Sequence, residues 1–302
     1  MEHGSRKAIV AAFLANLGIA VAKLIAYVAT GAASMLAESI HSLADTGNQA
    51  LLLLGSKRGQ RAATPEHPFG YGRERYFWAF VVALVLFSLG SVFAIVEGIH
   101  KIQHPQPLES PQWAIGTLVL AILLETYSFK TAIQEARHLK GKESWWAFVK
   151  NAKSPELPVV LLEDLGALLG LVFALVGVGL AVVTGESRYD ALGSIVIGAL
   201  LGVIAVILAV EMKSLLVGEA ASSAQQSAIR EGFERAKYVR RLIHMRTMHL
   251  GPELLVAAKL EFEPSLSILE LADAINAAES SVRDRVPSAR LIFVEPDVYR
   301  GA

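Results

Sequence analysis

The sequence predicts an α-helical membrane protein, with six transmembrane helices followed by a small C-terminal α+β domain. Of the 302 residues, 53% are hydrophobic and 19% are charged, and the mean hydropathy is +0.46. Soluble domains carry about a quarter charged residues. Long apolar runs dominate up to about residue 217, and the charge density rises beyond it. We therefore expect a membrane domain over residues 1–217 and a soluble domain over 218–302.

Six runs are long enough to span a membrane. A spanning helix needs about 20 mostly apolar residues, and backbone in lipid must satisfy its own hydrogen bonds, so each run is expected to be a helix. The first run continues to Tyr27 without a small-residue cleavage site, which favours a span over a signal peptide. The predicted spans are residues 8–29, 33–55, 77–99, 112–135, 157–183 and 190–216.

The basic residues of the connecting loops predict the orientation. Cytoplasmic loops are enriched in Lys and Arg, and only Lys101 and Arg188 lie on the side opposite the basic loops. We therefore expect both termini in the cytoplasm. Without an Arg- and Ser-rich presequence, we expect a prokaryotic plasma membrane rather than a mitochondrial one. The basic loop residues are Lys57, Arg58, Arg61, Arg73, Arg75, Arg137, Lys140, Lys142, Lys150 and Lys153.

The C-terminal region has the periodicity of a small layered domain. Residues 222–236 and 267–285 show helical spacing, whereas 239–249, 254–262 and 290–295 show the pattern of strands. The order αββαβ predicts helices packed on one sheet.

The charge balance and the missing cysteines narrow the classes of function. The formal net charge is zero, which gives no argument for nucleic-acid binding. The chain has no cysteine, which excludes disulfides and thiolate metal sites. Sites built from histidine and carboxylates stay open.

A polar stripe interrupts the second predicted span. Glu38, His41, Asp45 and Asn48 fall within an arc of roughly 80° on a helix of 3.6 residues per turn. Ionisable side chains in a membrane cost about 2.5–3.5 kcal/mol each on insertion scales, so they usually mark a functional path. The alternative is a set of polar groups that join helices by hydrogen bonds. Two carboxylates and an imidazole on one stripe favour the functional interpretation.

The fifth span carries a second acidic pair, Glu163 and Asp164. Adjacent residues are about 100° apart around a helix, so at most one of them points straight at a shared site. The positions one turn before Asp164 are Val160 and Leu161, which cannot bind metal. An imidazole with two carboxylates is a ligand set that zinc, cobalt, nickel or iron accepts.

Several motifs resemble the cation diffusion facilitator family of metal exporters. They are HSLADTGNQ at 41–49, HPFGYGRERYFW at 67–78, GKESWW at 141–146 and LLEDLGALLGL at 161–171. The chain is most similar to the branch that includes the mitochondrial-type zinc exporter, and the resemblance covers nearly its whole length. It implies a ferredoxin-like cytoplasmic domain and a homodimer with paired tails.

The resemblance also implies a metal site. The family places a His or Asp four residues before an Asp on span two, and the same pair on span five. His41 and Asp45 match the first pair, and Asp164 matches the end of the second, but Val160 stands where the other ligand belongs. We therefore expect His41, Asp45 and Asp164 as ligands, with Asp164 ranked above Glu163. Glu163, Asn48 or water are the alternatives for completing the shell.

In the tail, His244 matches a position that the family uses for metal. The other imidazole positions are occupied by Lys259, Ala272 and Phe293. We therefore do not expect a binuclear metal site there.

These observations predict export of a divalent transition metal, with zinc favoured, against an inward flow of protons. Metal binding needs a neutral His41 and ionised Asp45 and Asp164, so metal and protons compete for the same groups. A site that opens to each side in turn then exchanges one for the other. The metal is the cargo, and no resident cofactor is expected.

Three alternatives stay open at this stage. Manganese, iron or cobalt are other candidate cargoes, because an incomplete ligand shell does not fix selectivity. A membrane-embedded metalloenzyme is a second alternative, although the chain has neither HExxH nor GxSxG. A non-transporting scaffold is suggested only by the ligand missing at Val160.

Overall fold

The structure is a computed structural model that describes residues 2–30, 33–105 and 111–300. The description leaves out the side chains of residues 2–7, 23, 26, 27, 29, 30, 33–41 and 44. The chain forms two compact units. The first contains the residues up to Lys57 together with Arg75–Lys213, and the second contains Arg58–Glu74 together with the residues from Ser214 onward.

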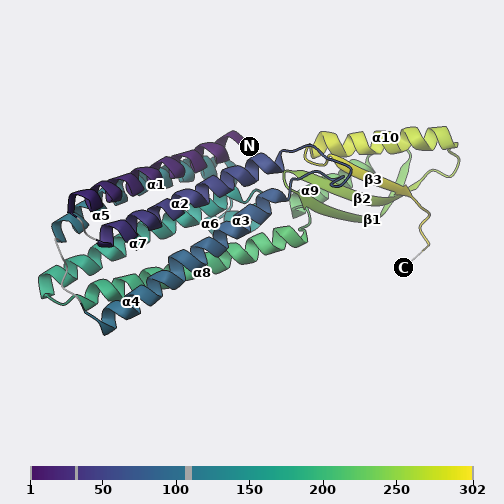
Figure 1. Cartoon of the computed structure of the whole chain (residues 1–302). Helices are drawn as coiled ribbons and strands as arrows, with labels where there is room; N and C mark the ends of the chain where they lie inside the picture. Colours follow the sequence, from purple (N-terminus) through teal and green to yellow (C-terminus); the bar gives the residue numbers. More distant parts are fainter. Residues whose placement is uncertain (1, 31–32, 106–110, 301–302) are drawn as a thin grey trace. The chain divides into compact units, whose positions relative to one another are not determined.

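The first unit is a bundle of long helices (Figure 1). α3, the π-helix η1 and α4 follow one another without a break, so the described residues form six long helices at the positions of the six apolar runs. The short α6 was not predicted; Ser144 caps it by accepting a hydrogen bond from the backbone N–H of Ala147. The elements are α1 (Glu2–Thr30), α2 (Ala33–Gly59), α3 (Glu74–Val85), η1 (Leu86–Val92), α4 (Phe93–Gln103), α5 (Pro111–Lys140), α6 (Trp145–Asn151), α7 (Glu156–Thr184) and α8 (Arg188–Val217).

Within the described residues, four of these helices are long and apolar enough to cross a membrane. They are the continuous helix Glu74–Gln103, α5, α7 and α8. In α1 the described apolar stretch is shorter, Ala8–Ala22. The chain therefore has a helical membrane-type domain, and the count of six spans stays a prediction.

Glycines bring α8 against the third long helix. A Cβ atom on Gly98 would lie 2.6 Å from Ile195 Cγ1 and 2.8 Å from the carbonyl oxygen of Ala191. A Cβ atom on Gly198 would lie 2.6 Å from Ile95 Cγ1. Small residues allow this close backbone approach, which is a common means of helix association in membranes.

The third long helix contains a π-helical segment, Leu86–Val92. π-turns are rare and frequently occur at functional sites. Leu86 begins this segment and lines a cavity between the helices.

A buried ion pair joins the starts of α3 and α7. Arg75 Nε lies 2.5 Å from Glu156 Oε1, and the two side chains are 4% and 2% exposed. Beside it, the Tyr76 hydroxyl donates a hydrogen bond of 3.1 Å to the carbonyl oxygen of Lys153. These contacts fix the two helix starts to each other.

The second unit contains a three-stranded sheet covered by helices. β1 (Val239–Leu250) pairs antiparallel with β2 (Glu253–Phe262), and β2 pairs parallel with β3 (Leu291–Pro296). The helices are α9 (Ser223–Glu234) and α10 (Ile268–Arg285). The order αββαβ is the one that the sequence predicts.

The core of this unit follows from the alternation along β2. Every second residue of the strand is buried, from Leu254 to Phe262. These side chains pack with Ile229 and Phe233 of α9 and with Val282 of α10. Capping boxes begin both helices, with Ser222 and Gln225 at α9 and Ser267 and Glu270 at α10.

The segment 58–74, which links α2 and α3, packs in this second unit. A Cβ atom on Gly72 would lie 2.1 Å from the carbonyl oxygen of Leu250, so only glycine fits there. Gly251, in the turn after β1, has a φ of +74°. Arg73 Nη2 also lies 2.9 Å from the sulfur of Met248.

Candidate cation site

Acidic side chains from three helices meet at a cavity of about 50 Å³ inside the bundle. Asp45 comes from α2, Glu125 from α5 and Glu163 from α7. The rest of the lining is Asn16, Leu86, Ala167 and Leu201. A cavity of this size, lined by polar groups, has room for a water molecule or a single ion.

Two amides of α2 hold the Glu163 carboxylate in place. Asn48 Nδ2 donates to Oε1 at 2.8 Å, and Gln49 Nε2 donates to Oε2 at 2.8 Å. Asn16 of α1 supports Gln49 by donating to its Oε1 at 3.3 Å. A carboxylate oxygen has two acceptor positions, so both oxygens of Glu163 keep one for a cation.

Asp164 faces a different neighbour. Its Oδ2 accepts a hydrogen bond of 2.7 Å from Ser128 of α5. The residue is 1% exposed and is not part of the cavity lining. This is the geometry expected of adjacent residues on one helix, and it directs Glu163 rather than Asp164 toward the cavity. The ranking of Asp164 above Glu163 as a ligand stays a prediction, although Glu163 is the acid of this pair that lines the cavity.

The remaining predicted ligands lie on α2. Asp45 is half-buried and lines the cavity. Asn48 is 2% exposed; its amide nitrogen holds Glu163, and its Oδ1 has no hydrogen-bond partner among the described residues. His41 lies four residues before Asp45 on α2, but its side chain is outside the described residues. Within the described part of the chain, no three His, Asp or Glu side chains already stand close enough to hold one metal ion.

Sequence reasoning missed Glu125, Ser128, Gln49 and Asn16. Glu125 is 2% exposed and lines the cavity. It follows the apolar residues LAILL within the fourth predicted span. An ionisable side chain in a span usually marks a functional path, so the sequence already contained a signal for Glu125 as it did for Glu163. Val160, four residues before Asp164, is fully buried.

In the second unit, basic groups surround His244. His244 pairs with Lys259 across β1 and β2, and its Nε2 accepts a hydrogen bond of 3.0 Å from Arg246 Nε. Phe293, at another imidazole position, is 55% exposed. A metal cation bound by His244 would meet repulsion from Lys259 and Arg246.

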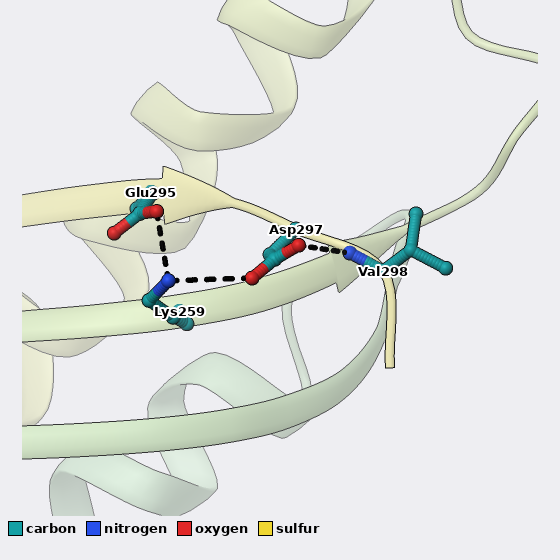
Figure 2. A network of polar contacts seen from close by, with 4 residues as sticks. All are labelled: Lys259, Glu295, Asp297 and Val298. Atoms are coloured by element: carbon teal, nitrogen blue, oxygen red, sulfur yellow. Dashed lines mark hydrogen bonds and ion pairs between the residues drawn. The ribbon is translucent and has the colours of Figure 1, made fainter. Parts of the chain in front are cut away.

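Figure 2 shows that Lys259 is itself engaged by acids. Its Nζ lies 2.8 Å from Glu295 Oε1 and 3.3 Å from Asp297 Oδ2. The hydrogen bond to Glu295 and then the one to Asp297 raise the pKa of the Lys259 ammonium. The backbone N–H of Val298 donates to Asp297 Oδ1 and, with Lys259, lowers the pKa of that carboxyl. The ammonium group therefore stays protonated at neutral pH and cannot serve as a metal ligand.

Known proteins are similar to this chain over most of its length. The proton-coupled zinc antiporter SLC30A9, mitochondrial, of Xenopus laevis is 37% identical over 232 residues, which are 76% of this chain and 41% of that protein. The human protein of the same name is 34% identical over the same length. The cation-efflux pump FieF of Pectobacterium atrosepticum is 25% identical over 291 residues, 96% of this chain and 92% of that protein.

A solved structure titled MamM-CTD is also similar. It covers 25% of this chain and 96% of its own length, at 21% identity and a TM-score of 0.24. The chain spans about two fifths of the length of the SLC30A9 relatives that it matches.

The family model described as the cation efflux transmembrane domain matches residues 9–217. That range covers more than half of the chain and contains every residue of the acidic cavity. The chain therefore belongs to the cation efflux, or cation diffusion facilitator, family, in the neighbourhood of the SLC30A9 branch.

Proposed function

We propose that this protein exports a divalent transition-metal cation across a membrane, with zinc as the preferred ion and inward protons as the counter-flow. The observation that carries the proposal is the acidic cavity inside the helix bundle. Asp45, Glu125 and Glu163 come from three different helices and line the same cavity. Buried carboxylates need a counter-charge, and a transported cation supplies one.

The names of the relatives support zinc as the cargo and protons as its counter-ion. Zinc accepts both imidazole nitrogen and carboxylate oxygen, and His41 stands one turn before Asp45 on α2. Manganese, iron and cobalt are the alternative ions, because carboxylates also suit harder cations.

Proton coupling follows from the chemistry of such ligands. A carboxylate binds either a proton or the metal, and a neutral imidazole is needed for metal binding. A site that opens alternately to the two sides would then release metal where protons bind. Among the side chains that the structure describes, the acids around the cavity do not yet lie close enough together to hold one ion. Binding would draw α2, α5 and α7 together, which is the kind of helix movement that alternating access requires.

The remaining parts of the proposal concern the arrangement in the membrane. We propose a six-span transport domain over residues 1–217 and a cytoplasmic domain over 218–302. Both termini would be cytoplasmic, and two copies would form a homodimer. A prokaryotic plasma membrane stays our prediction for the location.

The experiment is zinc flux into sealed vesicles that contain the purified full-length chain. A pH gradient should drive uptake, and collapsing the gradient should abolish it. Asp45→Ala should abolish flux while the protein stays folded, because a ligand is lost without a change in helix packing. Asp190→Ala is the matched control: Asp190 pairs with the half-exposed Lys101 and is not part of the cavity lining. Unchanged flux in Asp45→Ala would refute the site, and no flux of any divalent ion in the unaltered protein would refute the function.

A further inference from the structure

Glu125 is the acidic group of the cavity that no motif of the sequence assigned. It lies on α5, a helix that packs against both α1 and α7. It is 2% exposed, and its neighbours around the cavity include Asp45 and Glu163. Ser128, one turn further along the same helix, holds Asp164 by a hydrogen bond of 2.7 Å. One face of α5 therefore meets both acids of α7.

The Glu125 carboxylate differs from the two acids of α7 in having no hydrogen-bond or ion-pair partner among the residues that the structure describes. Glu163 accepts two amide hydrogen bonds and Asp164 accepts one from Ser128. Among the described residues, Glu125 has neither a hydrogen bond nor an ion pair, and the charges that act on it are Asp164, Asp45 and Glu163. All three are acidic, so the described charges around Glu125 repel its carboxylate. An isolated buried carboxylate is costly unless it binds a proton or a cation. A cation in the cavity would therefore compete with a proton for Glu125, as the proposed exchange requires.

A second observation at the same place is an unsatisfied oxygen. Asn48 Oδ1 is buried and has no hydrogen-bond partner within the described residues, while the nitrogen of the same amide donates to Glu163. Most buried polar atoms are paired, and each exception needs an explanation. A cation near Glu163 would give this oxygen a partner.

We propose that Glu125 is a cation-binding residue that supplies, from α5, the ligand that α7 lacks at Val160. This inference rests on the proposed function, because it adds one residue to the transport site. Val160 is fully buried and apolar, so the α7 position itself offers no donor atom. A carboxylate from α5 would restore the number of ligands and make the set richer in oxygen.

The test compares Glu125→Gln with the unaltered protein, both full-length and purified in detergent. The matched control is Glu135→Gln, the same exchange ten residues further along α5 and outside the cavity lining. Zinc affinity is measured by calorimetry, and the melting temperature is measured with and without zinc. Loss of supporting groups around metal ligands typically costs 10–100-fold in affinity. We expect Glu125→Gln to weaken zinc binding by at least about tenfold and Glu135→Gln to leave it unchanged.

The melting temperature separates a ligand from a structural residue. Without zinc, Glu125→Gln should melt at the same temperature as the unaltered protein or higher, because the exchange removes repulsion among buried acids. The zinc-induced rise in melting temperature should shrink, because a weaker ligand stabilises less at the same concentration. A structural role would lower the zinc-free melting temperature and leave zinc affinity intact, and that pair of results would overturn the inference.

A third variant keeps the test decisive if Glu125→Gln fails to fold. Glu125→Asp retains the charge but shortens the side chain, so it should fold and bind zinc more weakly than the unaltered protein. Unchanged zinc affinity in Glu125→Asp would then overturn the inference. Failure of the proposed function looks different, because the unaltered protein would itself show neither zinc flux nor zinc binding.

Discussion

Breaking the buried ion pair between Arg75 and Glu156 should destabilise the helix bundle more than any exposed ion pair does. The two side chains are 4% and 2% exposed, with 2.5 Å between Arg75 Nε and Glu156 Oε1. Glu156→Gln removes the negative charge that lies against this buried guanidinium. Removing one partner of a buried pair costs about 3–5 kcal/mol, most of it from the charge left behind. We expect the free energy of unfolding to fall by that amount.

The double variant Arg75→Met with Glu156→Leu tests this reasoning. Replacing both charges by apolar groups of similar size is often neutral or stabilising. The double variant should therefore unfold within about 1 kcal/mol of the unaltered protein, or above it, although each single change is severe. The assay is reversible unfolding of the purified protein in mixed detergent micelles, followed by circular dichroism.

The pair Lys101–Asp190 provides the control. Lys101 Nζ lies 3.3 Å from Asp190 Oδ2, and the side chains are 43% and 18% exposed. Exposed pairs contribute about 0–1 kcal/mol, so Lys101→Met should have little effect. Additive losses in the Arg75 and Glu156 double variant, or single losses below about 1 kcal/mol, would refute the assignment of a desolvated pair.

Three further predictions concern the two units separately. Neutralising the α7 acids one at a time should weaken zinc flux more in Glu163→Gln than in Asp164→Asn, because Glu163 lines the cavity; equal flux in both would contradict the geometry. Residues 220–302 alone should show no stoichiometric zinc binding by calorimetry, and a tight one-to-one signal would contradict the basic surroundings of His244. The backbone N–H and hydroxyl of Ser267 lower the pKa of Glu270, so Ser267→Ala should raise that pKa part of the way toward its ordinary value in an NMR titration. Because the folded-state pKa lies below the unfolded one, the stabilisation of α10 by this pair is present above the unfolded pKa and is lost as pH falls through the folded pKa.

Most helices and strands could be predicted from the sequence because their signals are local. A run of about 20 apolar residues is enough to predict a long helix. The spacing of apolar residues, every second residue in β2 and every third or fourth in α10, predicts these elements in the same way. The short helix α6 escaped prediction because it is only seven residues long and begins at the Ser144 cap. The grouping of residues 58–74 with the tail also escaped it. That grouping depends on a backbone contact between Gly72 and Leu250, which are far apart in the chain.

The residues of the candidate site also differ in whether local sequence signals predict them. His41 and Asp45 stand four residues apart on one helix, so spacing alone puts them on one face. Glu125 shares no motif with them, and only the packing of α5 against α7 brings it to the cavity. A Glu in an apolar span is nevertheless a signal that can be read without a structure.

For the two acids of α7, the family motif and the helix face select different residues as the candidate ligand. A motif ranks residues by their place in a pattern, and the pattern selects Asp164. The face that a residue presents depends on its neighbours, and here the amides of Asn48 and Gln49 direct Glu163 toward the cavity while Ser128 holds Asp164 against α5. If Glu125 is the ligand that replaces the one missing at Val160, the α7 ligand is Glu163 instead of the adjacent Asp164. The remaining ligand then comes from α5. The transport site of this chain would then keep the α2 half of the family pattern and replace the α7 half with a carboxylate pair, Glu163 and Glu125, that comes from two helices.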